Sequence, residues 1–179
     1  MHPANAKAKP EIQLQQEFWS EHAALFDDLK RSVIWDERMR ARKTASFGVS
    51  YDYSQIAYPE AIMHPSLKEV CAGIAGLLGF KPNNCLLNYY LDGSSSMGFH
   101  SDSAEQLSPD TGVAILSLGC AREIQYRSKT DRQNIVSYTL EPGSLLFMST
   151  EVQERWMHSI PKMEGVGERI SATFRAVEK

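Results

Sequence analysis

Cysteine is scarce in this chain of 179 residues, and the few that occur exclude a disulfide framework. There are three, Cys71, Cys85 and Cys120, and none forms a C-x-x-C pair. An odd number at wide spacing argues against structural disulfides. We expect these cysteines to be small buried apolar side chains in a reducing cytoplasm.

Long apolar runs are also missing. None approaches the length of a membrane-spanning helix, and the first seven residues, MHPANAK, lack the apolar centre of a signal peptide. We therefore expect a cytoplasmic protein with no membrane partner, and a monomer.

The motifs of two other enzyme classes are absent. The stretch 93–96 (GSSS) does not match the G-x-S-x-G elbow of hydrolases, and 165–167 (GVG) is not followed by the helix that a dinucleotide site needs. Neither serine hydrolysis nor dinucleotide binding is indicated.

The chain has no excess of positive charge. Its 19 basic and 22 acidic residues give a formal net charge of −3, which provides no general attraction to phosphate. Two local basic runs could still follow a nucleic-acid backbone, although such runs are more often solvated surface. They are Arg38, Arg40, Arg42 and Lys43, and Arg122, Arg127, Lys129 and Arg132.

Composition and periodicity favour one globular domain, residues 1–179, mainly β with helical cover (α+β). Helical spacing predicts helices over 12–29 and 65–78, the second ending at Gly79. Short alternating segments after Asn84 predict strands that suit a double-stranded β-helix, or jelly roll, with the ligand site inside its open end. These segments are 85–91, 111–119, 123–127, 135–140, 144–148, 155–160 and 169–177.

Two imidazoles and a carboxylate form the strongest candidate site. On a strand, His100 and Asp102 point to the same side while Ser101 points away. His158, with Trp156 and Ile160 on its face of another strand, could complete the set. Three such ligands with open positions suit iron(II), and a catalytic zinc is chemically possible. A chance surface pair is the alternative for His100 and Asp102.

A row of polar side chains near the C-terminus could meet an anion. Alternation places Arg169, Ser171, Thr173 and Arg175 on one face. Burying two guanidinium groups is costly unless something anionic meets them, and a guanidinium pairs a carboxylate through two hydrogen bonds. Without a metal site nearby, a solvated edge strand would explain the same pattern.

Four motifs in order resemble the AlkB-type iron(II)/2-oxoglutarate dioxygenases. They are 88–90 (NYY), 100–102 (HSD), 156–161 (WMHSIP) and 169–175 (RISATFR). Upstream, 42–48 (RKTASFG) and 51–54 (YDYS) resemble the family's substrate-contacting segment. The resemblance implies an N-terminal helical segment (1–35), a substrate-facing segment (36–60) and a jelly-roll core (84–179).

The resemblance implies a role for each matching residue. His100, Asp102 and His158 would bind Fe(II), and Arg169 would pair the distal carboxylate of 2-oxoglutarate with help from Asn88 and Tyr90. Arg175 would lie near the metal-proximal end of this co-substrate. Family chemistry uses O2 to convert 2-oxoglutarate to succinate while a substrate C–H bond is oxidised, and an oxidised N-methyl group leaves as formaldehyde.

Substrate contacts are expected from the upstream segment. Enzymes that act on a flipped base grip it by aromatic stacking and polar contacts. Phe47, Tyr51, Tyr53 and Arg42 match that segment, although alternating aromatics also describe a strand packed on a core. Several family members carry an acidic pair after the metal motif, whereas this chain reads Ser103-Ala104-Glu105 and keeps one carboxylate, Glu105.

We therefore expect an iron(II)/2-oxoglutarate dioxygenase that demethylates alkylated nucleobases in DNA or RNA. The missing acidic neighbour leaves open the same chemistry on a small molecule, amino acid or peptide. A binding module of cupin type that has lost its metal is a third interpretation, and the intact triad argues against it.

Overall fold

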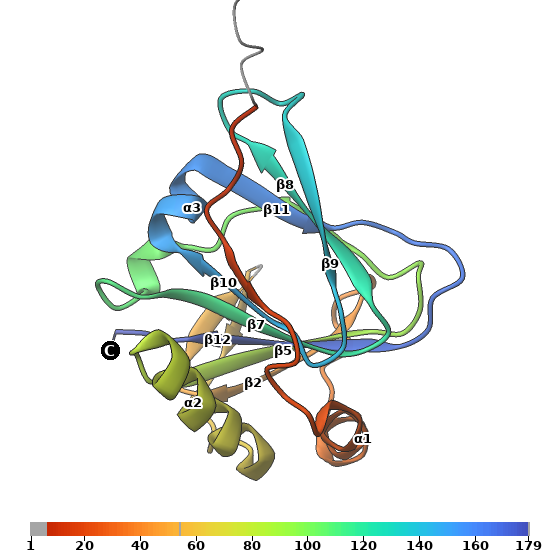
Figure 1. Cartoon of the computed structure of the whole chain (residues 1–179). Helices are drawn as coiled ribbons and strands as arrows, with labels where there is room; N and C mark the ends of the chain where they lie inside the picture. The colour runs from red at the N-terminus through yellow and green to blue at the C-terminus, as the bar shows by residue number, and fades with distance from the viewer. Residues whose placement is uncertain (1–6, 54, 179) are drawn as a thin grey trace, which may run out of the picture.

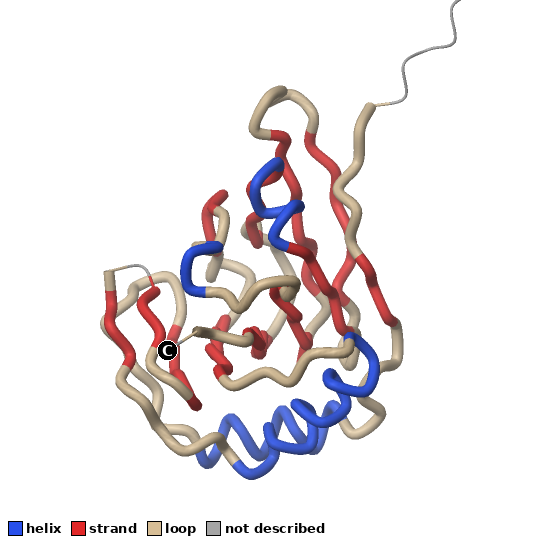
Figure 2. Tube along the Cα trace, turned by 90° about the vertical axis from the view of Figure 1, so that its left-hand side faces the viewer, coloured by secondary structure: helices blue, strands red, loops and turns tan. Residues whose placement is uncertain are grey.

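Two sheets face each other, and two helices cover the outer side of the larger one (Figure 1). The computed structural model describes residues 7–53 and 55–178. The larger sheet has the order β1-β10-β7-β12-β5-β2, the smaller β6-β11-β8-β9, and β3 pairs with β4 in a separate hairpin. Figure 2 shows the two long helices below the strands. The predicted mainly β fold with helical cover is confirmed.

The elements of the larger sheet and the hairpin are β1 (Gln13–Gln15), β2 (Lys43–Gly48), β3 (Tyr51–Tyr53), β4 (Ile56–Tyr58), β5 (Asn84–Tyr90), β7 (Gly112–Gly119), β10 (Leu145–Ser149) and β12 (Arg169–Arg175). The smaller sheet contains β6 (Met97–His100), β8 (Arg122–Ser128), β9 (Ile135–Leu140) and β11 (Trp156–Ile160). The helices are α1 (His22–Ser32), α2 (Pro65–Leu78), α3 (Thr150–Arg155) and the short 3₁₀ turn η1 (Ala104–Gln106).

Strict alternation along β12 separates an apolar layer from a polar one. Ile170, Ala172 and Phe174 lie in the core cluster that the larger sheet shares with α1 and α2. The residues between them face the smaller sheet and line a pocket. β12 pairs with β5 on one side and with β7 on the other along its whole length. It is therefore a central strand, and this register determines which of its side chains face the smaller sheet.

The helix α2 forms where the sequence predicts it. Pro65 stands in the first turn, and the His64 side chain accepts a hydrogen bond from the Ser66 N–H. Gly79 ends the helix at φ 78°, and its N–H donates to the Ala75 carbonyl. Cys71 of α2 and Cys85 of β5 are free and buried, as expected, whereas Cys120 is half-buried.

The predicted helix over 12–29 is wrong in its first half. Residues 13–15 form β1, which pairs with β10, and α1 begins only at His22. Glu17 adopts φ 53°, which a continuous helix does not allow. Pairing with an open sheet edge therefore overrides the helical periodicity of this stretch.

The strands β2, β3 and β4 and the helix α3 are not among the predicted elements, and the strand expected to carry both His100 and Asp102 is β6, which ends at His100 and leaves Asp102 in the segment that follows. β2 pairs with β5 and β6 pairs with β11, and each partner is distant in the sequence. The alternation of apolar and polar residues within these short segments therefore gives little indication of a strand. In the described ranges 7–53 and 55–178, no helix is both long and apolar enough to cross a membrane.

Two glycines of α2 offer a stability test with opposite expected signs. Gly76 is an exposed interior helical residue and Gly79 is the left-handed end residue, and an added Cβ meets no atom within 4 Å at either position. We expect Gly76→Ala to raise the free energy of unfolding by about 0.5–1 kcal/mol. Gly79→Ala should lower it by about 1 kcal/mol, because φ 78° strains alanine. Urea denaturation measures both, and equal signs would contradict this account of the helix end.

Candidate metal and co-substrate site

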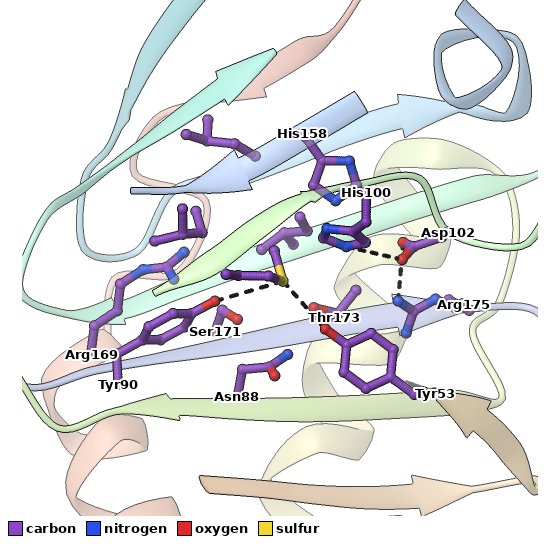
Figure 3. A pocket seen from close by; sticks show the side chains of 14 residues that line it. Tyr53, Asn88, Tyr90, His100, Asp102, His158, Arg169, Ser171, Thr173 and Arg175 are labelled. Atoms are coloured by element: carbon purple, nitrogen blue, oxygen red, sulfur yellow. Dashed lines mark hydrogen bonds and ion pairs between the residues drawn. The ribbon is translucent and has the colours of Figure 1, made fainter. Parts of the chain in front are cut away.

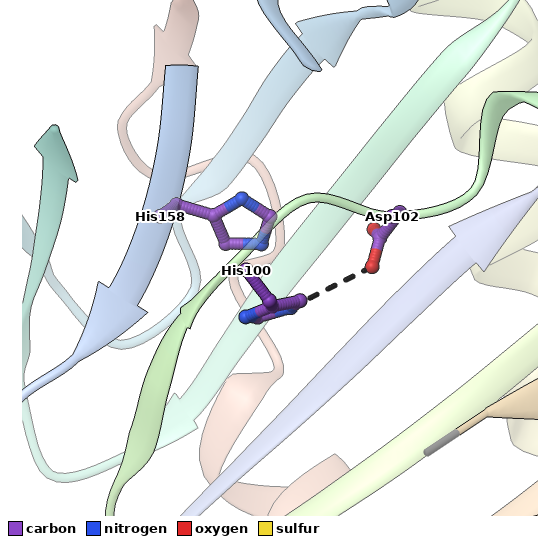
Figure 4. Close-up of side chains that lie close together, drawn as sticks. All are labelled: His100, Asp102 and His158. Atoms are coloured by element: carbon purple, nitrogen blue, oxygen red, sulfur yellow. Dashed lines mark ion pairs between the residues drawn. The ribbon is translucent and has the colours of Figure 1, made fainter. Parts of the chain in front are cut away.

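Three side chains that can hold a metal meet between the two sheets. His100 ends β6 and is paired with His158 of β11, while Asp102 follows β6 by two residues. Their ligand atoms all lie within 4.8 Å of one another (Figure 4). The structure thus brings together the three predicted ligands from segments 56 residues apart in sequence.

The His100 ring has one nitrogen committed and one available. Its Nδ1 lies 2.9 Å from the Gly98 carbonyl oxygen, and because a carbonyl only accepts, Nδ1 carries the proton in the neutral ring. Nε2 is left with a lone pair and lies 3.6 Å from Oδ1 of Asp102. This tautomer directs the free nitrogen of His100 toward the other two ligands.

Asp102 is buried and ionised. Its Oδ2 accepts a hydrogen bond of 3.1 Å from Nη2 of Arg175, and its backbone N–H donates to Oε1 of Gln153 at 3.2 Å. Burial opposes ionisation, but Arg175 and the two histidines outweigh it and hold the pKa of Asp102 well below its usual range. The site therefore has a carboxylate at neutral pH.

His158 is neutral in the metal-free protein. The ring is 2 % exposed, and burial lowers its pKa to about 4 although the neighbouring Asp102 opposes that shift. Two neutral imidazoles and one carboxylate form a donor set that suits a divalent iron and leaves coordination positions for other ligands.

The pocket beside these ligands is lined by the polar row of β12 (Figure 3). Arg169, Ser171, Thr173 and Arg175 all contribute, as alternation predicted, and both arginines are buried. The other lining residues are Tyr53, Asn88, Tyr90, Met97, His100, Asp102, Ile115, Ile124, His158 and Ile160.

Arg169 is a buried cation with unused hydrogen-bond donors. It is 0 % exposed, its Nη2 donates to the Ser117 hydroxyl at 3.0 Å, and its Nε and Nη1 have no partner among residues 7–53 and 55–178. Burial lowers its pKa to about 10, so it is still charged at pH 7. Because a buried charge with free donors is costly, an anion such as the distal carboxylate of 2-oxoglutarate fits this position.

The opposite end of the row is occupied by Arg175. Its guanidinium carbon lies 4.4 Å from the centre of the Tyr51 ring, and one of its nitrogens bonds Asp102. In the described part of the chain, its Nε and Nη1 also have no partner. Arg175 therefore lies against the candidate metal ligand Asp102 and retains donors that the described residues do not use.

The predicted substrate residues fall in different places. Tyr53 lines the pocket, whereas Tyr51 is not one of the pocket residues and is buried against Arg175. Arg42 is buried, with Nε donating to Asn88 Oδ1 at 2.7 Å, Nη1 to the Ser96 carbonyl at 3.1 Å, and Nη2 to the Tyr53 hydroxyl. Arg42 is thus held within the protein.

The remaining two predicted substrate residues do not line the pocket. Phe47 packs on the core cluster at the helix-covered side of the larger sheet and contacts the His64 ring edge-on, with centroids 5.7 Å apart. Glu105 is exposed on η1. Strand alternation explains Phe47, because its neighbour Ala45 faces the same core.

Two of the four side chains of the first predicted basic run form ion pairs with nearby carboxylates. Arg38 bonds Asp36, and Lys43 lies 2.6 Å from Glu37. In the second run, Arg122 is fully buried and Arg127 stacks on Phe99, with its guanidinium carbon 4.1 Å from the ring centre. These contacts engage cationic side chains that the sequence analysis considers as possible phosphate-binding residues.

Sequence reasoning missed Gln153 and Met97. Gln153 is 3 % exposed and accepts a hydrogen bond from the Asp102 backbone N–H. Nothing in the sequence around this glutamine indicates such a contact. Met97 lines the pocket because β6 shifts register between its pairings His158↔His100 and Ile160↔Met97. Simple alternation from His100 would have placed position 98, and not 97, on the pocket side.

Comparisons with known proteins indicate the family of this chain. A family described as the 2OG-Fe(II) oxygenase superfamily matches residues 6–175. DNA oxidative demethylase ALKBH2 of Homo sapiens is 30% identical over 147 residues, which are 76% of this chain and 56% of that protein. Alpha-ketoglutarate-dependent dioxygenase alkB homolog 3 of Rattus norvegicus is 30% identical over 173 residues, 86% of this chain and 59% of that protein.

A solved structure shares the fold. The structure of OsALKBH1 superposes with a TM-score of 0.69 at 17% sequence identity, covering 95% of this chain and 100% of that one. This likeness confirms the predicted jelly-roll fold. The chain spans less than two thirds of the length of the curated relatives named above.

Burial of His158 predicts a pH-dependent stability of the metal-free protein. The folded ring resists protonation until about pH 4, whereas an unfolded histidine takes up a proton near pH 6.5. The unfolded state therefore binds more protons in this window, and the free energy of unfolding should fall by about 1–3 kcal/mol as pH drops from 6.5 to 4. Urea denaturation across this range, with chelator present, measures the loss, and His158→Gln should flatten it. An equal slope in the variant would contradict the assignment.

Proposed function

This chain belongs to the 2OG-Fe(II) oxygenase superfamily and is of the AlkB type, and from that premise we propose that it oxidatively demethylates alkylated nucleobases in DNA or RNA. Fe(II), 2-oxoglutarate and oxygen, predicted from the motifs, are confirmed as the reagents of its family. One observation carries the proposal: three side chains that can hold a metal converge at one end of a pocket whose other end holds Arg169, a buried guanidinium with donors that find no partner in the described residues.

The metal ligands and the arginines have separate tasks in this proposal. His100, Asp102 and His158 hold iron(II), which together with 2-oxoglutarate and oxygen supplies the oxidation of a substrate C–H bond. Arg175 keeps the Asp102 carboxylate ionised and oriented through its 3.1 Å hydrogen bond. Arg169 receives the distal carboxylate of 2-oxoglutarate.

Side chains of β5, β7 and the smaller sheet complete the pocket. Asn88 and Tyr90 assist in binding 2-oxoglutarate, since both line the pocket on the strand paired with β12. Ile115, Ile124 and Ile160 form apolar wall between the sheets and limit water. A dry pocket favours oxidation of the bound substrate over side reactions.

The hairpin β3–β4 is the proposed substrate contact. Tyr53 lines the pocket, and Arg42 fixes its hydroxyl while also holding Asn88. Arg42 then acts on substrate through Tyr53. Glu105, exposed beyond Asp102, is available to a base edge, whereas Phe47 supports β2 from the core side.

The name of one relative supports a nucleic-acid substrate, since ALKBH2 is called a DNA oxidative demethylase. The second candidate is the same chemistry on a small molecule, amino acid or peptide. Internal pairing of Arg38, Arg42 and Lys43 favours it, because phosphate binding needs free cations. A cytoplasmic location and a monomeric state stay predictions.

His158→Ala should abolish coupled turnover. Loss of one of three ligands removes the metal, so succinate formation from 2-oxoglutarate should fall at least ~100-fold. Anaerobic iron(II) titration and succinate release measure the effect, with His22→Ala in α1 as the remote control. Full turnover by His158→Ala would overturn the ligand assignment.

A substrate panel separates the two candidates. We expect formaldehyde from methylated single-stranded DNA, duplex DNA or RNA, with succinate formed in equal amount. The same panel with unmethylated oligonucleotides is the matched control. Silence on all three methylated substrates, with uncoupled consumption of 2-oxoglutarate, would reject nucleobase demethylation and favour the small-molecule substrate.

A further inference from the structure

Arg122 is a fully buried cation for which the proposed mechanism has no task. It is the first residue of β8 and is 0 % exposed, yet it does not line the pocket. Its hydrogen-bond acceptors are three backbone carbonyl oxygens: Asp92 at 3.3 Å, Ser95 at 2.8 Å and Pro161 at 2.7 Å. Within residues 7–53 and 55–178, no carboxylate forms an ion pair with it.

These carbonyls belong to two loops that lead into the pocket wall. Ser95 lies two residues before Met97, the start of β6, and Pro161 directly follows Ile160, the end of β11. Met97 and Ile160 both line the pocket. Through these hydrogen bonds, Arg122 connects the segment before β6 with the segment after β11, and these two strand ends form one side of the pocket.

Arg122 shares an aromatic ring with Arg169. The guanidinium carbon of Arg122 lies 5.4 Å from the centre of the Tyr90 ring, and that of Arg169 lies 5.1 Å from the same centre. Tyr90 is 0 % exposed. Two buried cations thus lie close to one ring, at the end of the pocket where Figure 3 shows Arg169 and Tyr90.

Neutral carbonyls solvate the Arg122 charge without cancelling it. In a buried environment of low dielectric constant, such a charge acts over several ångströms. A ligand bound at Arg169 therefore experiences two positive charges, and the second favours a ligand that ends in a carboxylate.

We propose that Arg122 is a positioning residue for the co-substrate: it holds Tyr90 and the two strand ends in place and makes the Arg169 end of the pocket selective for a dicarboxylate over a monocarboxylate 2-oxoacid. This inference rests on the proposed use of 2-oxoglutarate. It assigns to Arg122 a charge effect that a purely structural residue would not have.

The test compares two ligands that differ at the distal end. Isothermal titration of the Mn(II)-loaded protein under anaerobic conditions gives dissociation constants for 2-oxoglutarate and for 2-oxobutyrate, which lacks the distal carboxylate. Arg122→Met removes the charge at similar length, and Arg122→Lys keeps it. Arg31→Met, on the exposed surface of α1, matches the change in net charge.

Arg122→Met should reduce the preference for 2-oxoglutarate over 2-oxobutyrate roughly tenfold. Arg122→Lys should weaken both ligands a few-fold, because one ammonium cannot span three carbonyls, while keeping the preference within about twofold of wild type. Arg31→Met should behave as wild type. If Arg122→Met does not fold, as judged by circular dichroism, Arg122→Gln replaces it as the neutral variant.

An unchanged preference in the neutral variant, or an equal loss of preference in Arg122→Lys, would overturn the charge effect. Unaltered affinity in Arg122→Lys would overturn the positioning effect. A wild-type protein that does not bind 2-oxoglutarate would instead contradict the proposed function, so the two failures are distinguishable.

Discussion

The ion pair between Arg175 and Asp102 joins the two sheets at the point where the metal ligands meet. Arg175 belongs to β12 at the centre of the larger sheet, and Asp102 follows β6 of the smaller one. Each charge would be costly in the interior without the other. The pair therefore fixes the spacing of the sheets and keeps a carboxylate ready for a divalent ion.

The interior around this pair carries an excess of positive charge. Arg42, Arg122, Arg169 and Arg175 are buried, and Asp102 is the buried acidic residue in the described part of the chain. Carbonyls, hydroxyls and aromatic rings solvate the guanidinium groups. Such an arrangement is expensive to fold unless an anion contributes to it, which links the stability of the pocket to binding of a dicarboxylate.

Apolar packing on the far side of the larger sheet makes this polar interior possible. The helices α1 and α2 bury the outward-facing residues of β5, β7 and β12, so these strands stay in register whatever their inner faces carry. The inner face is then free to bear hydroxyls, amides and guanidinium groups in place of a second apolar layer. The cationic pocket depends on that division of the sheet into two faces.

Features that repeat along a single element could be predicted from the sequence. Alternation through Arg169 and Arg175 placed their row on one face, the pattern from Pro65 to Gly79 defined α2, and the spacing of His100 and Asp102 indicated a shared side. Local backbone geometry is sufficient for these, because side-chain direction follows directly from helix or strand period.

Which elements meet depends on the folding of the whole chain. It sent Phe47 to the core side and buried Arg42, it turned residues 13–15 into an edge strand, and it brought Gln153 to the backbone of Asp102. It also placed the Arg122 guanidinium close to the Tyr90 ring. Such contacts depend on strand pairing and on charge burial between distant segments, and no periodicity within a single segment records them.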